Sequence, residues 1–223
     1  FKDTQNFLKS KKMMYLKLHT FRQGQEYFDA AINFDYYILK NENNNKFITE
    51  ISNVRNEIEK IDISKVEFIS DENIINIQNL VAKDGEENVK ILYSRSLYGT
   101  DKTNMSKYEN DEFKYPCVYT VKSPDNGNKP TFYYSSVKKE FFIPKVIWGN
   151  GASGVMIDIN GNYGLTQFAY AISDDVENLE NIKKAMQTEK FVKDIMGFKH
   201  SLGDKYNRKV ISTFRKDFWK EFI

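Results

Sequence analysis

The sequence of 223 residues contains one cysteine, two histidines, four prolines and eleven glycines. A single cysteine, Cys117, excludes an intramolecular disulfide and a zinc site built from several thiolates, and it favours a reducing compartment, the cytoplasm. His19 and His200 lie far apart, so no ligand spacing indicates a metal site. No apolar run approaches the roughly 18 residues of a membrane span, and the first residues do not resemble a signal peptide. We therefore expect no membrane association.

Aromatic and apolar residues are plentiful, at 15% and 40% of the chain. A chain with this composition can bury enough apolar surface to offset the entropy of ordering, which excludes general disorder. The length allows one large domain or two small ones, since domains commonly hold roughly 100–200 residues. The first residue is Phe1, and we expect the chain to be a piece of a longer protein or one part of a split system.

The net charge of +2 conceals an uneven distribution along the chain. Three segments are basic, with +5, +4 and +4 over residues 1–22, 113–151 and 199–223. The intervening segments are acidic, with −2, −6 and −3 over residues 23–41, 42–112 and 152–198. A local basic patch, rather than the overall charge, holds a polyanion, so these segments predict a polyanion-binding face if folding brings them together. The alternative is a set of solvated lysines without a binding role.

The spacing of apolar residues predicts an α+β fold with a mixed, mostly antiparallel sheet and a C-terminal helical segment. The predicted strands are residues 12–19, 34–39, 66–69, 89–93, 116–121, 131–134, 143–148, 155–159 and 163–172. Asn160-Gly161 separates the last two strands and predicts a hairpin, because both turn positions favour positive φ. Helices are expected over residues 72–82, after a capping pair at Asp174 and Glu177, and again from Thr188. Non-regular structure is predicted for residues 22–25, 41–46 and 99–111.

Two local motifs resemble ligand sites but lack the context that those sites need. Residues 149–154 match G-x-G-x-x-G after an apolar strand, but the β-branched residues that follow will not form the helix on which a dinucleotide pyrophosphate rests. A loop that approaches a DNA phosphate remains possible there. Residues 158–162 imitate the start of a calcium loop, yet its sixth position is Tyr163 and its twelfth is Ala169, so calcium binding is not expected.

Basic residues interleaved with aromatic residues form the remaining pattern with chemical meaning. Lysine and arginine neutralise phosphates, and asparagine and arginine can read base edges. Much of the aromatic content must be core, as we expect for residues 214–222. The residues predicted to contact DNA are Lys114, Lys129, Lys138, Lys139, Lys145, Trp148, Asn150, Lys205, Arg208, Lys209, Arg215 and Lys216.

Several stretches together resemble a family of DNA-modifying enzymes. They are residues 28–41, 115–121, 142–148, 161–169 and 214–222. These stretches are similar to the C-terminal half of adenine-specific DNA methyltransferases, in particular restriction-modification methylases with a TaqI-like C-terminal specificity domain. The resemblance extends over most of the chain through loose patterns rather than a strict signature.

The resemblance implies a division of the chain into three parts. Residues 1–41 would be the last strands of the catalytic domain, with residues 34–37 near the flipped adenine. Residues 42–112 would be a mixed α/β connecting region, and residues 113–223 the target-recognition domain. The sequence has no Asn/Asp-Pro-Pro-Tyr motif and no glycine motif for S-adenosylmethionine, so no catalytic residue, cofactor or metal is assigned to this chain. The resemblance implies S-adenosylmethionine as the cofactor of the full-length enzyme.

These observations favour a DNA-recognition module that is not catalytic alone. Its expected partners are double-stranded DNA and the missing catalytic domain, in cis or in trans. One alternative is a protein-interaction or structural module derived from such an enzyme without DNA-modifying activity. A second alternative is a nuclease or other hydrolase whose carboxylates the sequence does not single out.

Overall fold

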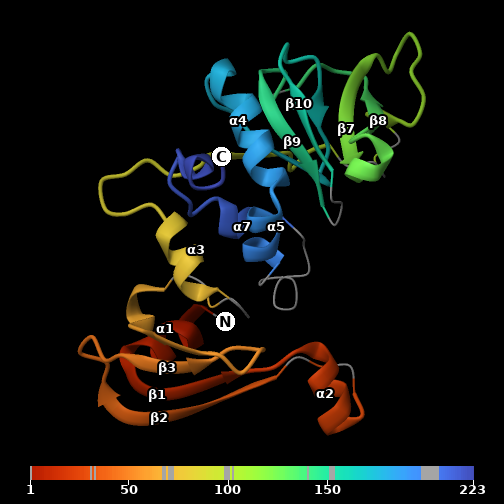
Figure 1. The fold of residues 1–223 in the computed structure, drawn as a ribbon. Coiled ribbons are helices and arrows are strands. Elements are labelled where there is room, and N and C mark those ends of the chain that lie inside the picture. Colours follow the sequence, from red (N-terminus) through yellow and green to blue (C-terminus); the bar gives the residue numbers. More distant parts are fainter. Residues whose placement is uncertain are drawn as a thin grey trace. The chain divides into compact units, whose positions relative to one another are not determined.

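The computed structural model of the chain describes residues 2–30, 32, 34–66, 69, 73–97, 101, 103–139, 141–150, 154–196 and 206–223 (Figure 1). These residues form two compact units, the first ending at Asn79 and the second beginning at Leu80. Helices and mostly antiparallel sheets confirm the predicted α+β class. No helix in the described ranges is long and apolar enough to cross a lipid bilayer.

The first unit is a four-stranded sheet with short helices. Its elements are α1 (Lys2–Ser10), β1 (Lys11–Leu18), α2 (Phe21–Phe28), β2 (Asp35–Asn43), β3 (Thr49–Ser52), β4 (Ile58–Ile61), the 3-10 helix η1 (Ile63–Lys65) and α3 (Ile74–Leu80). The strand order is β2-β1-β3-β4, in which β1 pairs antiparallel with β2 and parallel with β3. β1 and β3 supply much of the core, which consists of Met13, Leu16, Leu18, Ile51, Ile63, Val66 and Ile74. The predicted domain boundary after residue 41 falls inside β2.

Residues 22–25 lie within the helix α2, so the predicted turn is wrong. Thr20 and Gln23 form a capping box at its N-terminus, each side chain bonding the backbone of the other residue. Gly24 serves a close approach rather than a turn, because a Cβ at this position would lie 1.9 Å from the carbonyl oxygen of Ile32. Elsewhere in this unit, β2 continues into the predicted loop as far as Asn43, and α1, β3 and β4 were not expected.

The second unit contains two four-stranded sheets and the C-terminal helices. Its elements are β5 (Ile91–Tyr93), β6 (Met105–Ser106), β7 (Tyr115–Val121), the 3-10 helix η2 (Pro124–Asn126), β8 (Pro130–Ser135), β9 (Lys145–Gly149), β10 (Val155–Asp158), β11 (Gly164–Leu165), β12 (Ala169–Ile172), α4 (Val176–Gln187), α5 (Glu189–Met196), α7 (Arg208–Ile211) and the 3-10 helix η3 (Phe218–Glu221). The strand orders are β10-β9-β12-β5 and β11-β7-β8-β6.

The core of the second unit draws on both sheets. One cluster consists of Leu92, Val118, Val121, Ile147, Leu165, Ala169 and Ala171. On β9, Ile147 belongs to this cluster, and its neighbours Val146 and Trp148 are buried as well. α4 packs along β9 and β10 (Figure 1) through its buried residues Leu179, Ile182, Ala185 and Met186. β9 is therefore covered on both faces.

The Asn160-Gly161 turn is present, but the predicted hairpin is wrong. Gly161 has a φ of 66°, as the turn requires. The strands on either side of it do not pair with each other, because β10 pairs with β9 and β11 pairs in parallel with β7. The predicted strand over residues 163–172 is in fact β11 and β12, which belong to different sheets.

The C-terminal segment packs against the beginning of the second unit. Phe214 and Phe218 are fully buried, which confirms that the terminal aromatic residues contribute to the core. The Arg215 amide donates to the carbonyl of Leu80, and the Val89 amide donates to the carbonyl of Phe214, each over 2.8 Å. The two ends of this unit are thus joined by backbone hydrogen bonds.

Candidate nucleic-acid interface

A row of aromatic side chains crosses the sheet β10-β9-β12-β5. Trp148 on β9 pairs in register with Tyr170 on β12, and Tyr170 pairs with Tyr93 on β5. Trp148 is fully buried and Tyr170 is 8% exposed, whereas Tyr93 is partly exposed on the edge strand. Cross-strand neighbours such as these lie close enough to pack on one another, so the row leads from the core to the surface.

The segment before α7 is held over this row by side-chain hydrogen bonds. The Trp148 indole N–H donates to the carbonyl of Tyr206 over 3.1 Å, and the Tyr206 hydroxyl donates to the carbonyl of Met186 over 3.2 Å. The Asn207 side chain accepts from the Lys209 amide over 2.9 Å and caps α7. Arg208 is thereby placed with its guanidinium carbon 4.3 Å from the ring centre of Tyr93 and 5.5 Å from that of Tyr170.

Arg95 approaches the same tyrosine from two residues further along the chain. Its guanidinium donates a hydrogen bond to the Tyr93 hydroxyl, and its central carbon lies 5.0 Å from the ring centre. The hydrogen bond from Arg95, with the charges of Arg95 and Arg208, lowers the pKa of Tyr93. Two guanidinium groups therefore converge on one phenol, and we call Tyr93, Arg95 and Arg208 the Tyr93 cluster.

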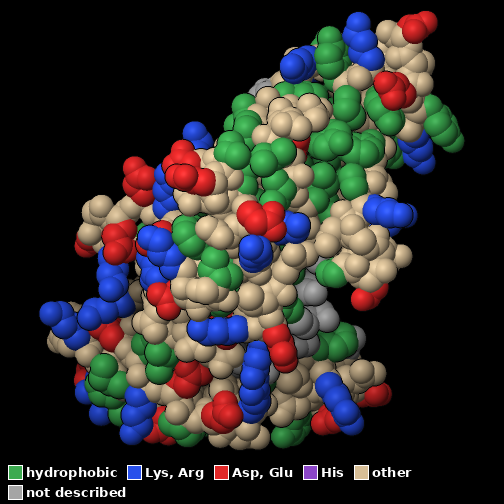
Figure 2. Space-filling view, turned by 45° about the horizontal axis from the view of Figure 1, so that its top comes forward, with side chains coloured by type: hydrophobic (Ala, Val, Ile, Leu, Met, Phe, Trp, Pro, Cys, Tyr) green, Lys and Arg blue, Asp and Glu red, His purple; other side chains and the backbone are tan. Residues whose placement is uncertain are grey.

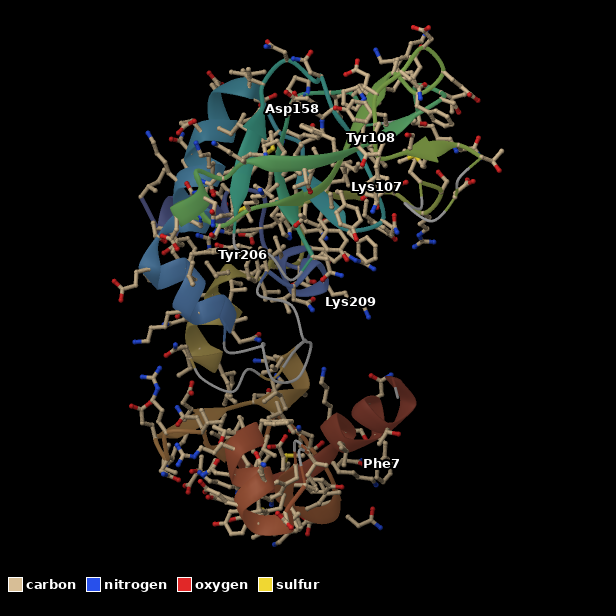
Figure 3. The ribbon with its side chains drawn as sticks, turned by 90° about the vertical axis from the view of Figure 1, so that its right-hand side faces the viewer. Phe7, Lys107, Tyr108, Asp158, Tyr206 and Lys209 are labelled. Atoms are coloured by element: carbon tan, nitrogen blue, oxygen red, sulfur yellow. The ribbon has the colours of Figure 1, made fainter. Side chains whose placement is uncertain are left out.

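Two lysines flank the Tyr93 cluster. Lys139 donates to the Ser96 hydroxyl over 3.4 Å, next to Arg95 in the chain. Lys209 follows Arg208 in α7 and is exposed at the surface of the second unit (Figure 3). Among the described residues, no carboxylate forms an ion pair with any of these four cations. On the face shown in Figure 2, Lys and Arg side chains are interspersed with Asp and Glu side chains.

Lys145 does not contact solvent, so its prediction as a DNA-binding residue is wrong. Its ammonium is fully buried and donates to the Asp158 carboxylate over 2.6 Å and to the carbonyls of Tyr163 and Ile143 over 2.7 and 3.0 Å. Burial lowers the pKa of Lys145, and the hydrogen bond and charge of Asp158 oppose that change. Lys145 therefore stabilises the fold around Asp158.

Trp148 is the second predicted DNA contact that the structure places in the core. It is fully buried, and the carbonyl of Tyr206 accepts its only N–H donor. The prediction is wrong because β9 lies between α4 and the core, and every residue of that strand is buried. Trp148 instead lies at the buried end of the aromatic row that leads to Tyr93.

Arg215 and Lys216 lie in a different part of the second unit and have acidic partners. Arg215 pairs with Asp217 at 3.0 Å and also with Glu221. Burial alone would lower the pKa of Arg215, but the hydrogen bonds and charges of those two carboxylates outweigh it and raise the pKa. Lys216 lies 3.9 Å from Glu87. These predicted contacts therefore do not form an unneutralised basic patch.

The other predicted contacts are not brought into the Tyr93 cluster by any described contact. Lys114 and Lys138 lie over the rings of Tyr115 and Phe142, with their ammonium groups 5.8 and 5.2 Å from the ring centres. Lys129 and Asn150 are exposed, at the start of β8 and the end of β9. Lys205 lies outside the described residues.

The G-x-G-x-x-G stretch has a packing role in the structure. β10 follows it, as expected, instead of a helix. A Cβ at Gly149 would lie 2.2 Å from the Thr120 hydroxyl, and one at Gly154 would lie 1.7 Å from the carbonyl oxygen of Lys122. These two glycines therefore allow β7 and its exit to approach the strands β9 and β10 closely. Residues 151–153 lie outside the described ranges.

Other ligand sites find little support in the described parts of the chain. No group of three or more His, Cys, Asp and Glu side chains there is arranged to hold a metal ion. Burial raises the pKa of the Cys117 thiol to about 12, so it is protonated and a poor nucleophile. A hollow of about 560 Å³ has a lining of mixed charge, formed by Glu87, Asn88, Val89, Lys90, Ile172, Ser173, Asp174 and Lys216.

Tyr93 and Arg95 were not expected at this interface. The predicted strand 89–93 contains Tyr93, and Arg95 lies in the acidic segment 42–112, where a basic site is not anticipated. The sequence offers one local indication of this cluster: a tyrosine ends a short apolar strand, and an arginine follows two residues later. No protein-family model and no curated protein sequence matches the chain.

Proposed function

We propose that the chain is the sequence-recognition module of an adenine-specific DNA methyltransferase or restriction-modification enzyme and binds double-stranded DNA. The observation that supports this is the Tyr93 cluster, in which two arginines lie against aromatic rings, together with Lys139 beside Ser96 and the exposed Lys209 next to Arg208. Phosphate contacts from such cations position a protein on DNA and supply much of its affinity. The family part of the proposal depends on the sequence resemblance alone.

Methyl transfer would take place on a catalytic domain that this chain lacks, in cis or in trans. The hollow beside β5 does not fit S-adenosylmethionine, because its lining is of mixed charge and offers only Val89 and Ile172 as apolar side chains for an adenine ring. The buried, reduced thiol of Cys117 agrees with a cytoplasmic module.

The proposal is tested by measuring binding of a fluorescent DNA duplex by anisotropy across a salt series. The wild-type chain should bind at low salt with a steep log–log dependence of affinity on salt. Substitution of all four cations, Arg95→Gln, Lys139→Gln, Arg208→Gln and Lys209→Gln, should weaken binding and reduce the slope by about 3 to 4, since each neutralised phosphate contributes about 0.9 and the four cations would reach three or four phosphates. Absence of binding at low salt, or binding indifferent to salt, would contradict the proposal.

A matched control removes four cations elsewhere in the same unit. Lys183→Gln, Lys184→Gln, Lys216→Gln and Lys220→Gln give the same change in net charge, and three of these lysines already have acidic partners. The control should change the slope by less than about 1. Equal losses of DNA affinity in the two variants would show that the Tyr93 cluster acts only through the overall charge of the unit.

A protein-interaction module is the second candidate, because the edge strand β2 exposes apolar side chains. Tyr36, Tyr37 and Ile38 are 50%, 47% and 58% exposed, although they lie within a sheet. Long apolar edge strands favour pairing with other chains. Sedimentation of the wild type and of Tyr36→Ser/Ile38→Lys would separate the candidates: an interaction module self-associates or binds its partner through β2 and loses this in the variant.

A further inference from the structure

We propose that the Tyr93 cluster holds a single phosphodiester group of the bound DNA, with Arg95 and Arg208 as its two cationic sides. This inference rests on the proposed function and adds to it one site of defined geometry. Both guanidinium carbons lie within 5.0 Å of the Tyr93 ring centre, and hydrogen bonds and charge from both groups lower the pKa of Tyr93, so both groups act on the same phenol. A planar guanidinium is suited to bind two phosphate oxygens at once.

The charge of the cluster favours an anion as its ligand. Two like charges held close together repel, and among the described residues neither arginine forms an ion pair with a carboxylate. The Tyr93 hydroxyl accepts the hydrogen bond from Arg95 and keeps its own proton available as a donor. An anion between the guanidinium groups therefore relieves their repulsion and gains a neutral hydrogen-bond donor.

The cluster is also preorganised. Arg208 lies over the rings of Tyr93 and Tyr170. The two residues before it are held by hydrogen bonds, Tyr206 by the Trp148 indole and Asn207 by the Lys209 amide, so the backbone at Arg208 is fixed as well. Restriction of the side chains before binding lowers the entropic cost of placing them on a ligand. Lys209 and Lys139 carry no comparable restraint from aromatic rings among the described contacts. Arg95 and Arg208 should therefore fix the position of the DNA backbone, and the lysines should add general attraction.

A shared phosphate gives a quantitative signature in the salt series. Because a single phosphate is neutralised, Arg95→Gln/Arg208→Gln should lower the log–log slope by about 1 rather than about 2. Each single variant should weaken binding by about tenfold, and the double variant should weaken it by far less than the hundredfold product, since the effects of residues that share one partner are not additive. Tyr93→Phe keeps the ring and removes only the hydroxyl, so it should weaken binding about threefold with an unchanged slope.

Methylphosphonate substitution in the DNA identifies the phosphate itself. A duplex carrying one neutral methylphosphonate at successive positions should bind the wild type more weakly at one position than at its neighbours. At that same position the substitution should make no difference to Arg95→Gln/Arg208→Gln. Two separate sensitive positions, one for each arginine, would overturn the shared site. Lys216→Gln/Lys220→Gln removes the same charge from ion-paired lysines and should retain the wild-type profile.

The outcomes separate failure of this inference from failure of the proposed function. If the wild type binds DNA with a steep salt slope but the arginine variants match the Lys216/Lys220 control, the phosphate site is wrong and DNA binding stands. If the wild type binds no DNA at low salt, both the proposed function and the phosphate site on DNA are overturned. Inorganic phosphate provides the other arm: if the wild type binds no DNA, a change in the Arg95 and Arg208 Nε–H NMR signals at low millimolar phosphate would show that the site takes free phosphate instead of DNA. Thermal unfolding checks that each variant is folded.

Discussion

Among the described residues, each unit buries one lysine, and the two lysines are compensated in different ways. Lys17 in the first unit donates to neutral acceptors, the Ser52 hydroxyl at 3.0 Å, the Asn53 carbonyl at 3.0 Å and the Asn56 side chain at 2.7 Å. Lys145 in the second unit also uses three acceptors, but one of them is the Asp158 carboxylate. The ammonium group of each lysine therefore has three hydrogen-bond acceptors, but only the charge of Lys145 is neutralised by a carboxylate.

The difference follows the degree of burial. Lys17 is 8% exposed, and one of its acceptors, Asn56, is at the surface, so water can screen the charge. Lys145 has no exposed surface, and an isolated charge there would be very costly. The comparison shows that hydrogen bonds suffice for a lysine at the margin of a core and that a fully enclosed lysine needs a counter-ion.

Lys145→Met should have the largest effect because it leaves the Asp158 carboxylate buried without its cation. We expect the second unit to lose about 3–5 kcal/mol of unfolding free energy. Both tryptophans of the sequence belong to the second unit, so urea unfolding followed by tryptophan fluorescence reports on it. Lys145→Met/Asp158→Asn should recover part of the loss. A loss below about 1 kcal/mol in the single variant would show that the enclosed charge needs no counter-ion.

Lys17→Met should cost less, about 1–3 kcal/mol, because it leaves only neutral acceptors without a donor. The loss should be confined to the first unit, where hydrogen exchange of the β1 and β3 amides measures it. The tryptophan-detected unfolding of the second unit serves as the internal control and should not change. A cost equal to that of Lys145→Met would remove the distinction between neutral and charged compensation.

His19 should show the smallest effect, as a change of stability with pH. Burial, and next the charge of Lys17, lowers the pKa of His19 below 6.5, while Asp35 and backbone hydrogen bonds oppose this. Between that lowered value and 6.5 the unfolded chain binds more protons, so the stability of the first unit is complete above pH 6.5 and declines as the pH falls. Asp35 acts in the opposite sense at more acidic pH, because burial raises its pKa.

The Lys17→Met variant tests whether the charge of Lys17, which has no carboxylate partner among the described residues, causes part of this pH effect. Removal of the lysine charge should raise the pKa of His19 toward 6.5, as measured by NMR titration of the imidazole, and should weaken the acid sensitivity of the first unit. His19→Phe should abolish that sensitivity between pH 7 and 6, because a phenyl ring does not bind a proton. The first unit should still fold, since the phenyl ring can replace the imidazole stacked on Phe34, with ring centres 4.1 Å apart. An unchanged His19 pKa in Lys17→Met would mean that the lysine charge is screened completely.

The sequence was informative where local patterns decide the structure. Short runs of apolar and aromatic residues located β7 and β8, and the apolar spacing from Val176 located α4. The predicted capping pair of Asp174 and Glu177 is wrong, because the helix begins after Asp175, which makes no side-chain capping bond. The sequence was less informative for β11 and β12, since residues 163–172 have the composition of one strand and do not reveal that Gln167 and Phe168 turn the chain from one sheet to the other. Such partners are set by tertiary packing, which a single segment does not encode.

The candidate interface was predictable only in part. Arg208, Lys209 and Lys139 were identified because they lie in basic segments. Lys145 was misassigned because lysine is rarely enclosed, and its partner Asp158 is 13 residues away. Arg215 was misassigned because a count of charges along a segment does not show which carboxylates fold back on it, as Asp217 and Glu221 do.

The hydrogen bonds that join the two ends of the second unit also constrain how it folds. The Asn88 side chain donates to the Ser212 carbonyl across 124 residues of sequence, beside the bridges that pair Val81 with Phe214 and Asn88 with Arg215. Contacts between residues so far apart in the sequence require closure of a large loop before they stabilise the fold. They therefore form late and slow the folding of the second unit. During synthesis the first unit can complete its sheet while the ribosome is still translating the second, whose edge must wait for residues 212–216 to emerge.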